Sequence, residues 1–484
     1  MHHQDSQRQS RWQAAGSRQR ASKLPTADCP PAHLPVSWRL RVLVVFLFLL
    51  LAATGRAQSA DPSQAQPAAP TGERYAHMPD EAVPYRRFTK PYYDWFVRDD
   101  TIQYHGAADL RPDGDPAKLE EIAIGFLSPV ENNPESMFGI PAARGAQLAI
   151  DEANARGGYK GKPFALKVHN ESALWGASST ELVKMLFNEN CWAMAGCIDG
   201  QNCHIALRES LKLEVPILDI GTTDPTVTET RIQWLMHVFP DDRQQGYTLA
   251  DYVFKNLGLK RLGVIRTQTR YARLGVAKFN DEARRMGHQP ALEVKFERGD
   301  KDFSSQLRTL RDAHVEGIVI WGEAAEGGLI LKQMRALGMT QPVFGGSRLA
   351  YPQLIEIAGP AAEGLVVTAA LDPTRKDTRW QVFRDAYRAK YHEEPIDYAA
   401  YAYDGINILV AAIAKAGLNR GRIMDALRAY QMKTYSGVTG TDYFDYTLNN
   451  LAPVTLARVK GGKFEYWLAP RQHGHEGAAH TGGQ

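Results

Sequence analysis

The chain has 484 residues, of which 44% are hydrophobic and 23% are charged. This composition is typical of a globular protein, and the length is sufficient for two domains that each have a core. The formal net charge is +3, but the first 60 residues carry eight basic and two acidic side chains, or +6, so the remaining chain is at −3. A mildly acidic body lacks the concentrated basic face that nucleic-acid binding requires, and no nucleic-acid partner is expected.

The N-terminal region has the pattern of an export signal. Arg39 and Arg41 precede an apolar run at 42–53, and small residues up to Ala57 follow it. A basic start, about a dozen apolar residues and a small-residue exit predict a signal peptide. We therefore expect residues 1–57 to be a cleaved leader and the mature protein to be secreted into the periplasm. The apolar run is shorter than the roughly 20 residues of a membrane span, and an uncleaved anchor is the alternative.

Three further segments flank the expected globular body. Residues 58–72 are rich in Ala, Pro, Ser and Gln and predict a flexible linker. Residues 73–118 are aromatic and charged without a helix or strand period. They are interpreted as an N-terminal extension packed on the main body, with a partner-docking segment as the alternative. Residues 471–484 are expected to form a disordered tail.

From Glu120 onward, short apolar runs alternate with longer amphipathic stretches. The first set predicts strands at 121–126, 164–168, 192–196 and 216–220, with helices at 142–156, 178–190 and 204–213. The pattern restarts after Pro240 and predicts helices at 244–257 and 276–286, a further helix ending near His314, and strands at 262–265, 292–296 and 317–321. Alternating strands and helices indicate a parallel sheet covered on both faces, and two successive sets indicate two lobes.

Polar and small residues follow several of these strands. They are Asp199-Gly200-Gln201 after the third strand, Gly221-Thr222-Thr223 after the fourth, and Tyr271 after the first strand of the second set. Ligands of parallel sheets bind at the carboxyl ends of the strands, where backbone amides at helix N-termini hold anionic or carbonyl oxygens. These residues are therefore candidates for a ligand site. Helix capping by Thr222, Thr223 and Asp224 is the alternative reading.

Several stretches occur in an order that resembles the periplasmic leucine/isoleucine/valine-binding family. They are 139–162, 302–307, 357–359, 362–368 and 401–405, and the resemblance covers roughly 120–467. It implies a type I periplasmic binding fold, in which two doubly wound α/β lobes are joined by a hinge of three crossovers and close on the ligand. It also implies a receptor without a cofactor that captures a small polar molecule between its lobes. Such a receptor passes its ligand to the permease subunits of an ABC importer in a transient membrane-protein contact.

The resemblance also divides the chain into lobes. Lobe 1 is expected at 119–239 and again at 372–453, and lobe 2 at 240–371, with its final strand at 454–470. A sensory ligand-binding protein that feeds a membrane receptor shares the same fold and remains the alternative function.

The resemblance suggests individual site residues, each at a position that matches a ligand-binding position of the family. The positions that hold an amino acid's carboxylate correspond to Gly200, Gly221 and Thr223, where Gly200 replaces a hydroxyl residue. Tyr271 matches a tyrosine that stacks over the ligand, and Phe138 resembles an aromatic residue after the first strand.

Two family positions differ here. The second cleft tyrosine falls near Glu323, and the glutamate that binds the ligand's ammonium falls near Ser347. Because an unpaired buried charge is costly, leucine, isoleucine and valine are expected to bind weakly unless Glu323 or Asp199 takes the ammonium. An amide, a urea-like compound or a carboxylic acid is the alternative ligand.

Three cysteines, Cys191, Cys197 and Cys203, follow the expected leader. Secretion favours a disulfide. If 191–197 is a strand, its ends lie roughly 20 Å apart, beyond the roughly 7 Å between Cα atoms that a disulfide tolerates. Cys197–Cys203 is the favoured pair, with Cys191–Cys203 or three free thiols as alternatives. The spacing matches no common zinc pattern, so no metal is expected.

Enzyme motifs are missing from the sequence. It contains no Gly-x-Ser-x-Gly elbow, no phosphate-binding loop and no His-Glu-x-x-His. The chain is therefore expected to bind its ligand without catalysing a reaction.

Overall fold

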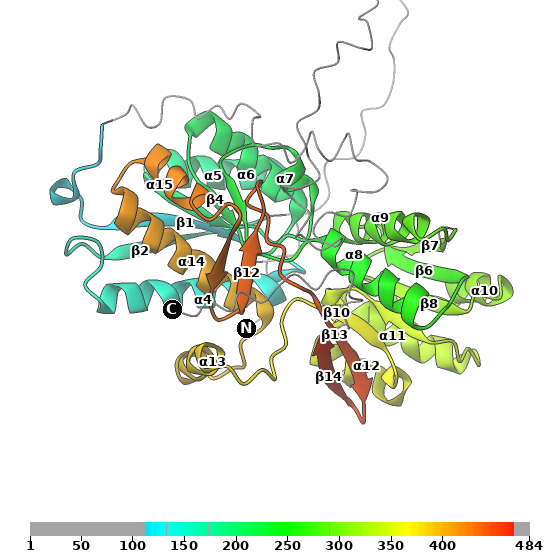
Figure 1. Cartoon of the computed structure of the whole chain (residues 1–484). Coiled ribbons are helices and arrows are strands. Elements are labelled where there is room, and N and C mark those ends of the chain that lie inside the picture. The colour runs from blue at the N-terminus through cyan, green and yellow to red at the C-terminus, as the bar shows by residue number, and fades with distance from the viewer. Residues whose placement is uncertain (1–111, 132, 173–174, 290, 469–484) are drawn as a thin grey trace, which may run out of the picture. The chain divides into compact units, whose positions relative to one another are not determined.

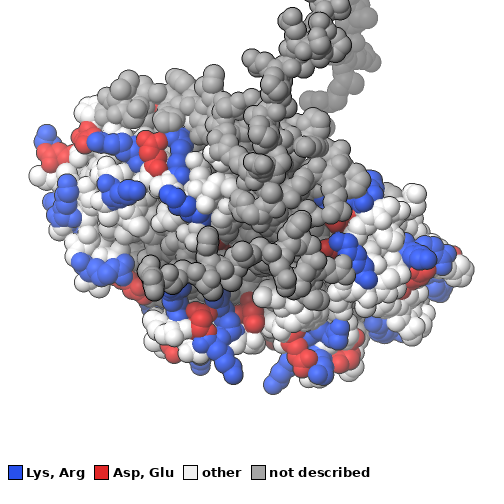
Figure 2. Space-filling view, viewed as in Figure 1, with Lys and Arg blue, Asp and Glu red and all other residues white. Residues whose placement is uncertain are grey.

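The computed structural model describes residues 112–131, 133–172, 175–289 and 291–468. The expected leader, linker and C-terminal tail lie outside these ranges, as does most of the N-terminal extension at 73–118. Within the described ranges, no helix is both long enough and apolar enough to cross a membrane. On the face seen in Figure 2, basic and acidic side chains are interspersed over the described residues.

The first sheet has five parallel strands in the order β2-β1-β3-β4-β5 among the described residues. They are β1 Ile122–Ser128, β2 Phe164–Asn170, β3 Ala193–Gly196, β4 Ile217–Asp219 and β5 Leu235–His237. In the register of the central strand, Ile124 pairs with Leu166 of β2 and with Ala193 of β3. All seven residues of β1 are buried, which explains why its sequence is a continuous apolar run.

Helices cover both faces of this sheet (Figure 1). Ile124 and Phe126 of β1 pack toward one face, while Ala123 and Leu127 pack toward the other. The first face is covered by α4 Ser136–Ala155 and α14 Asp397–Ala416. The second is covered by α5 Trp175–Val183, the π-helical turn Lys184–Asn188 and α6 Gly200–Leu213. The short helix α7 Thr226–Glu229 follows β4, and a 3₁₀ turn at Pro116–Lys118 precedes β1.

The second sheet has seven strands in the order β14-β13-β10-β9-β8-β6-β7 in the described part of the chain. They are β6 Leu262–Thr267, β7 Leu292–Phe296, β8 Gly317–Trp321, β9 Val343–Gly345, β10 Val366–Ala369, β13 Thr455–Lys460 and β14 Lys463–Leu468. The strands from β6 to β10 are parallel, whereas β13 is antiparallel to both β10 and β14. The sheet is therefore mixed rather than wholly parallel.

The single final strand expected at 454–470 is a hairpin of two strands. Gly461 and Gly462 form its turn, with φ of 58° and 74°. Two-residue hairpin turns need positive φ at both central positions, which glycine adopts at no steric cost. The Gly-Gly pair was therefore a hairpin signal in the sequence.

The helices of the second lobe also lie on both faces of its sheet. One face is covered by α8 Asp242–Ala250, its π-helical continuation Asp251–Asn256 and α9 Arg270–Arg285. The other face is covered by α10 Ser304–Asp312, α11 Ala324–Ala336, α12 Pro352–Ala358 and the 3₁₀ turn Gly359–Ala362. A second 3₁₀ turn, Ser347–Leu349, follows β9.

The chain passes between the two lobes three times, after β5, after β10 and before β13. After β10 it returns to the first lobe through α13 Thr378–Tyr391, α14, α15 Arg420–Arg428 and the hairpin of β11 Lys433–Ser436 with β12 Thr441–Phe444. The predicted fold class of two α/β lobes with three crossovers is thus confirmed, while the residue bounds of the domains remain a prediction.

Candidate ligand-binding site

A pocket lies where the carboxyl ends of the two sets of strands meet. Its empty volume is about 240 Å³, including the part open to solvent. The first lobe lines it with Ile198, Asp199, Gly200, Thr223 and Asp224, and the second with Asp242, Arg270, Tyr271, Leu274 and Arg348. Most of these residues lie in loops after strands or in the first turn of the following helix, the place where open α/β sheets bind ligands.

Four of the predicted residues line this pocket: Asp199, Gly200, Thr223 and Tyr271. Asp199 is the N-cap of α6, and its Oδ1 accepts from the backbone N–H of Gln201 at 2.9 Å. Burial raises the pKa of the Asp199 carboxyl. A Cβ at Gly200 would lie 2.6 Å from Oδ2 of Asp224, so the absence of a side chain lets the two loops approach. Tyr271 covers the pocket from the second lobe.

Glu171 holds the loop after β3 from beneath. Its fully buried carboxylate accepts from the backbone N–H of Ile198 at 2.8 Å and of Asp199 at 2.7 Å. It also accepts from Nδ2 of Asn202 at 3.2 Å. Burial, followed by the nearby charge of Asp199, raises the pKa of Glu171 well above its usual range. This role could not be predicted from the sequence, because Glu171 follows β2 and lies far from the loop along the chain.

Three predicted residues of the first lobe do not line the pocket. Gln201 is exposed on the first turn of α6. Gly221 lies behind Ile198, since a Cβ on Gly221 would be 2.6 Å from Cδ1 of Ile198. The buried Thr222 directs its hydroxyl into the protein, where it donates to Oδ2 of Asp219 at 2.5 Å.

The other three predicted residues surround the pocket without lining it. The backbone N–H of Ser347 donates to Oε1 of Gln245 at 3.3 Å. Phe138 is buried and stacks on Tyr398 with ring centroids 4.9 Å apart. Glu323 belongs to a group of buried charges around Arg348.

This interlobe charge cluster consists of Arg298, Arg348, Glu135 and Glu323. Arg348, only 2% exposed, donates from Nη1 to Glu135 at 2.9 Å and to Glu323 at 3.0 Å. Arg298 donates to the same two carboxylates at 2.7 and 3.2 Å. The two guanidinium groups outweigh burial and lower the pKa of Glu135, whereas burial raises the pKa of Glu323. Both cations contact Oε1 of Glu323, while its Oε2 is buried without a hydrogen-bond partner among the described residues.

Arg348 also lies between two aromatic rings. Its guanidinium carbon is 4.9 Å from the ring centroid of Phe138 in the first lobe and 4.4 Å from that of Tyr271 in the second. Cation–π contacts of this kind are worth more when the cation is desolvated. Arg348 therefore lines the pocket, whereas its neighbour Ser347, the predicted residue, does not.

A second ion pair joins the lobes at the edge of the pocket. Nε of Arg270 donates to Oδ2 of Asp224 at 2.6 Å, and Nη2 of Arg270 donates to the Thr226 hydroxyl at 2.8 Å. His204, Arg270 and Thr226 outweigh burial and hold the pKa of Asp224 well below its usual range. Arg270 and Asp224 are consequently paired with each other.

Asp242 is the least satisfied polar residue of the pocket. It is fully buried at the start of α8, and neither carboxylate oxygen has a hydrogen-bond partner of good geometry among the described residues. Burial raises the pKa of Asp242 well above its usual range, although the Thr223 side chain opposes the shift. Asp242 was not among the predicted site residues, because it lies just before the predicted helix at 244–257 and follows no predicted strand.

The predicted Cys197–Cys203 disulfide is absent from the structure. Within the described residues Cys191, Cys197 and Cys203 are buried free thiols. Sγ of Cys203 donates to Oδ2 of Asp219 at 3.4 Å, and burial raises the pKa of Cys191 to about 12. The described residues also contain no cluster of three or more His, Cys, Asp or Glu side chains able to hold a metal ion.

Two α/β lobes with three crossovers and a polar pocket between their strand ends are the architecture of two-lobed solute-binding proteins. The model of the family described as periplasmic binding protein matches residues 121–463, and the chain belongs to this family.

Relatives and solved structures agree with this assignment. The Leu/Ile/Val-binding protein homolog 2 of Brucella abortus is 28% identical over 356 residues, which are 72% of this chain and 93% of the relative. The leucine-binding protein LivK of Thermotoga maritima aligns with a TM-score of 0.65 and 27% identity, covering 72% of this chain and 99% of that one. The branched-chain amino acid transporter substrate-binding protein LivJ of Streptococcus pneumoniae, in complex with isoleucine, gives the same values.

Proposed function

We propose that this protein is a periplasmic receptor that binds a small polar ligand between its lobes and delivers it to an ABC importer. The observation that carries the proposal is the buried carboxyl of Asp242 in the pocket, which has no hydrogen bond of good geometry among the described residues and only the Thr223 side chain beside it. Family membership supports the binding role, and the relatives named for branched-chain amino acids support an importer as the partner. Export through cleavage of the leader at 1–57 belongs to the same proposal.

Asp242 indicates what the ligand must carry. A buried polar group without a hydrogen bond costs roughly 1–3 kcal/mol, so a ligand that donates to Asp242 recovers this energy on binding. The ammonium of an amino acid and the NH₂ group of an amide or urea-like compound are suitable donors. A simple carboxylate carries no such donor and would have to accept from a protonated Asp242. The ligand class that Asp242 favours is therefore an amino acid, an amide or a urea-like compound.

The weak binding expected for leucine, isoleucine and valine depended on Ser347, which replaces a glutamate of the family. Asp242 supplies a carboxyl group from another element of the same pocket, on the second lobe. On this proposal the ammonium partner has moved from the segment after β9 to the start of α8, and an amino acid remains an acceptable ligand.

Calorimetric titration of the mature chain tests the proposal with matched pairs of compounds. L-Leucine and L-isoleucine should be compared with the same molecules lacking the amino group, and acetamide with acetate. Compounds with a donor should bind, and Asp242→Asn should weaken them by about tenfold or more, the equivalent of roughly 1.4 kcal/mol.

The matched control is Asp385→Asn, a substitution of an exposed carboxylate on α13. It should leave the affinity unchanged. Equal affinity for compounds with and without the donor would contradict the role of Asp242. Delivery is tested by uptake of the bound compound in cells that lack the gene, which should fall to the level of cells lacking the permease.

A further inference from the structure

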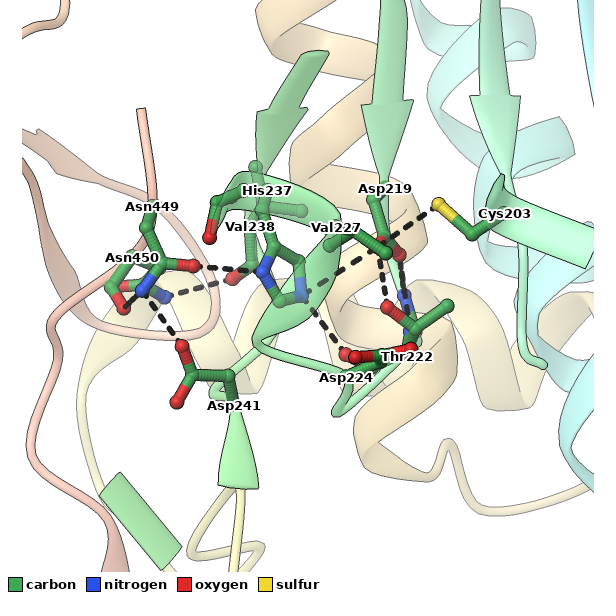
Figure 3. A network of polar contacts seen from close by, with 12 residues as sticks. Cys203, Asp219, Thr222, Asp224, Val227, His237, Val238, Asp241, Asn449 and Asn450 are labelled. Carbon is green, nitrogen blue, oxygen red and sulfur yellow. Dashed lines mark hydrogen bonds and ion pairs between the residues drawn. The ribbon is translucent and has the colours of Figure 1, made fainter. Parts of the chain in front are cut away.

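His237, the last residue of β5, is fully buried between the loop that follows β4 and a segment just before β13 (Figure 3). Its Nε2 lies 2.9 Å from the backbone carbonyl oxygen of Thr222. Its Nδ1 lies 2.8 Å from Oδ1 of Asn449. The ring thus connects the loop that carries Thr223 of the pocket to the third crossover between the lobes.

The orientation of the Asn449 amide is fixed by its other partners. Its Nδ2 donates to Oδ2 of Asp241 at 3.0 Å and to the backbone carbonyl of Asn450 at 3.2 Å. Both of these partners are acceptors only, so the amide nitrogen must face them and the amide oxygen must face His237. Turning the amide around would lose both hydrogen bonds and place its NH₂ group against the ring.

Both ring nitrogens of His237 therefore face oxygens that accept and cannot donate. A neutral imidazole carries one N–H and one acceptor nitrogen, whereas the imidazolium carries two N–H groups. Only the imidazolium forms both hydrogen bonds. A neutral ring would leave a lone pair against a buried carbonyl or amide oxygen.

The imidazolium form of His237 also balances the charges of the two buried carboxylates around it. Oδ2 of the buried Asp219 lies 3.7 Å from Nε2 of His237. Asp241, on the far side of Asn449, is paired with Arg243 through contacts of 2.9 and 2.5 Å. Arg243 and His237 together outweigh burial and lower the pKa of Asp241. A protonated His237 gives two cations for these two carboxylates, whereas a neutral ring would leave one carboxylate unmatched.

Two further titratable groups face this network. The Cys203 thiol of α6 donates to Asp219 at 3.4 Å and adds no charge. Asp445, in the loop before β13, accepts from the backbone N–H of Asn449 at 3.0 Å, and burial raises its pKa. Neither group supplies the positive charge that Asp219 needs.

We infer that His237 is a positioning residue that donates from both ring nitrogens and so fixes the ligand loop Gly221–Asp224 against the third crossover. Asp219 holds the same loop through the backbone N–H groups of Gly221 at 3.2 Å and Thr222 at 3.0 Å. The Thr223 carbonyl in turn accepts from the backbone N–H of Asp242 at 2.7 Å. The inference depends on the proposed function only in that this loop faces the ligand.

The decisive measurement is the protonation state of the ring in the ligand-free full chain, by ¹⁵N NMR with labelled histidine at pH 7. The signal of His237 is identified by its loss in His237→Gln and, if that variant does not fold, by its shift in Asn449→Ala. Two protonated ring nitrogens are expected. An unprotonated nitrogen at pH 7 would overturn the inference, and it would do so without bearing on ligand binding.

The positioning role has its own readout in hydrogen exchange. The amides of Gly221 and Thr222 should exchange at least about tenfold faster in His237→Gln, because local opening becomes easier by roughly 1.4 kcal/mol or more. The exposed His314 provides the control His314→Gln, which should leave these rates unchanged.

Discussion

Two groups of buried charges lie only a few residues apart in this protein, and they differ in how well they are satisfied. In the network around His237, every labelled polar side chain of Figure 3 has a partner within the protein. In the pocket, Asp242 is buried to the same degree and has no partner for either oxygen among the described residues. Buried polar groups are normally paired, so the state of Asp242 supports the proposal that a ligand binds beside it.

The largest effect is expected when the part of the His237 network that lies in the third crossover is deleted. Truncation after Thr441 removes Asn449, Asn450 and the β13–β14 hairpin, which belong to the crossover and to the second sheet. Both lobes should lose cooperative unfolding, as measured by circular dichroism during urea titration. A truncated chain that unfolds like the full chain would contradict this topology.

A single substitution should weaken the same network by a smaller amount. Asp219 accepts from Gly221, Thr222 and Cys203 and lies beside His237. Asp219→Asn should lower the free energy of unfolding by roughly 3 kcal/mol, since it leaves a buried cation without its counter-charge. Urea unfolding with Asp385→Asn as the control measures this loss, and a loss below that of the control would show that the ion pair is dispensable.

Substitutions in the pocket should affect binding more than folding. Tyr271→Ala removes an aromatic ring and Thr223→Ala removes a hydroxyl from the lining of the pocket. Each should weaken ligand binding by about tenfold or more, corresponding to roughly 1–3 kcal/mol. Calorimetry gives the affinity, and a melting curve shows whether the fold is retained. Unchanged affinity in both variants would place the ligand elsewhere.

The smallest expected effect is a small gain in the free energy of unfolding rather than a loss. Asp242→Asn should leave the free energy of unfolding unchanged or raise it by about 1 kcal/mol, because it removes a buried carboxyl group that has no partner. Since burial raises the folded-state pKa of Asp242, the folded state binds the proton more tightly and the wild type loses stability as pH rises above about 4. The advantage of the variant should therefore be larger at pH 7 than at pH 4. If Asp242→Asn lost as much stability as Asp219→Asn, the two carboxyl groups would not differ in how well the protein satisfies them.

The regular parts of the fold could be predicted from sequence because their burial repeats along the chain. The strands β7 and β8 have the predicted bounds, 292–296 and 317–321. The helices near the pocket begin earlier than predicted: α6 begins at Gly200 rather than His204, and α9 at Arg270 rather than Val276. Their first turns face the pocket and carry polar residues, so the apolar period starts only in the second turn.

Part of the candidate site could also be predicted, because some of its residues have a fixed place relative to the strands. Asp199, Gly200, Thr223 and Tyr271 could be found because they directly follow predicted strands. Arg348 and Asp242 could not be predicted, because a charged side chain is expected to be exposed to solvent unless its partner is known. One partner of Arg348 is Glu135, more than 200 positions earlier in the chain, and the Asp242 carboxyl has no hydrogen bond of good geometry among the described residues.

The hairpin of β13 and β14 has a consequence for the order in which the protein folds. Its strands complete the second sheet by pairing with β10, yet they come after the whole return of the chain through the first lobe. Until the last strands emerge, β10 is an open edge with unpaired backbone groups, the kind of surface that aggregates or binds chaperones. The second lobe therefore cannot close its sheet before synthesis is nearly finished.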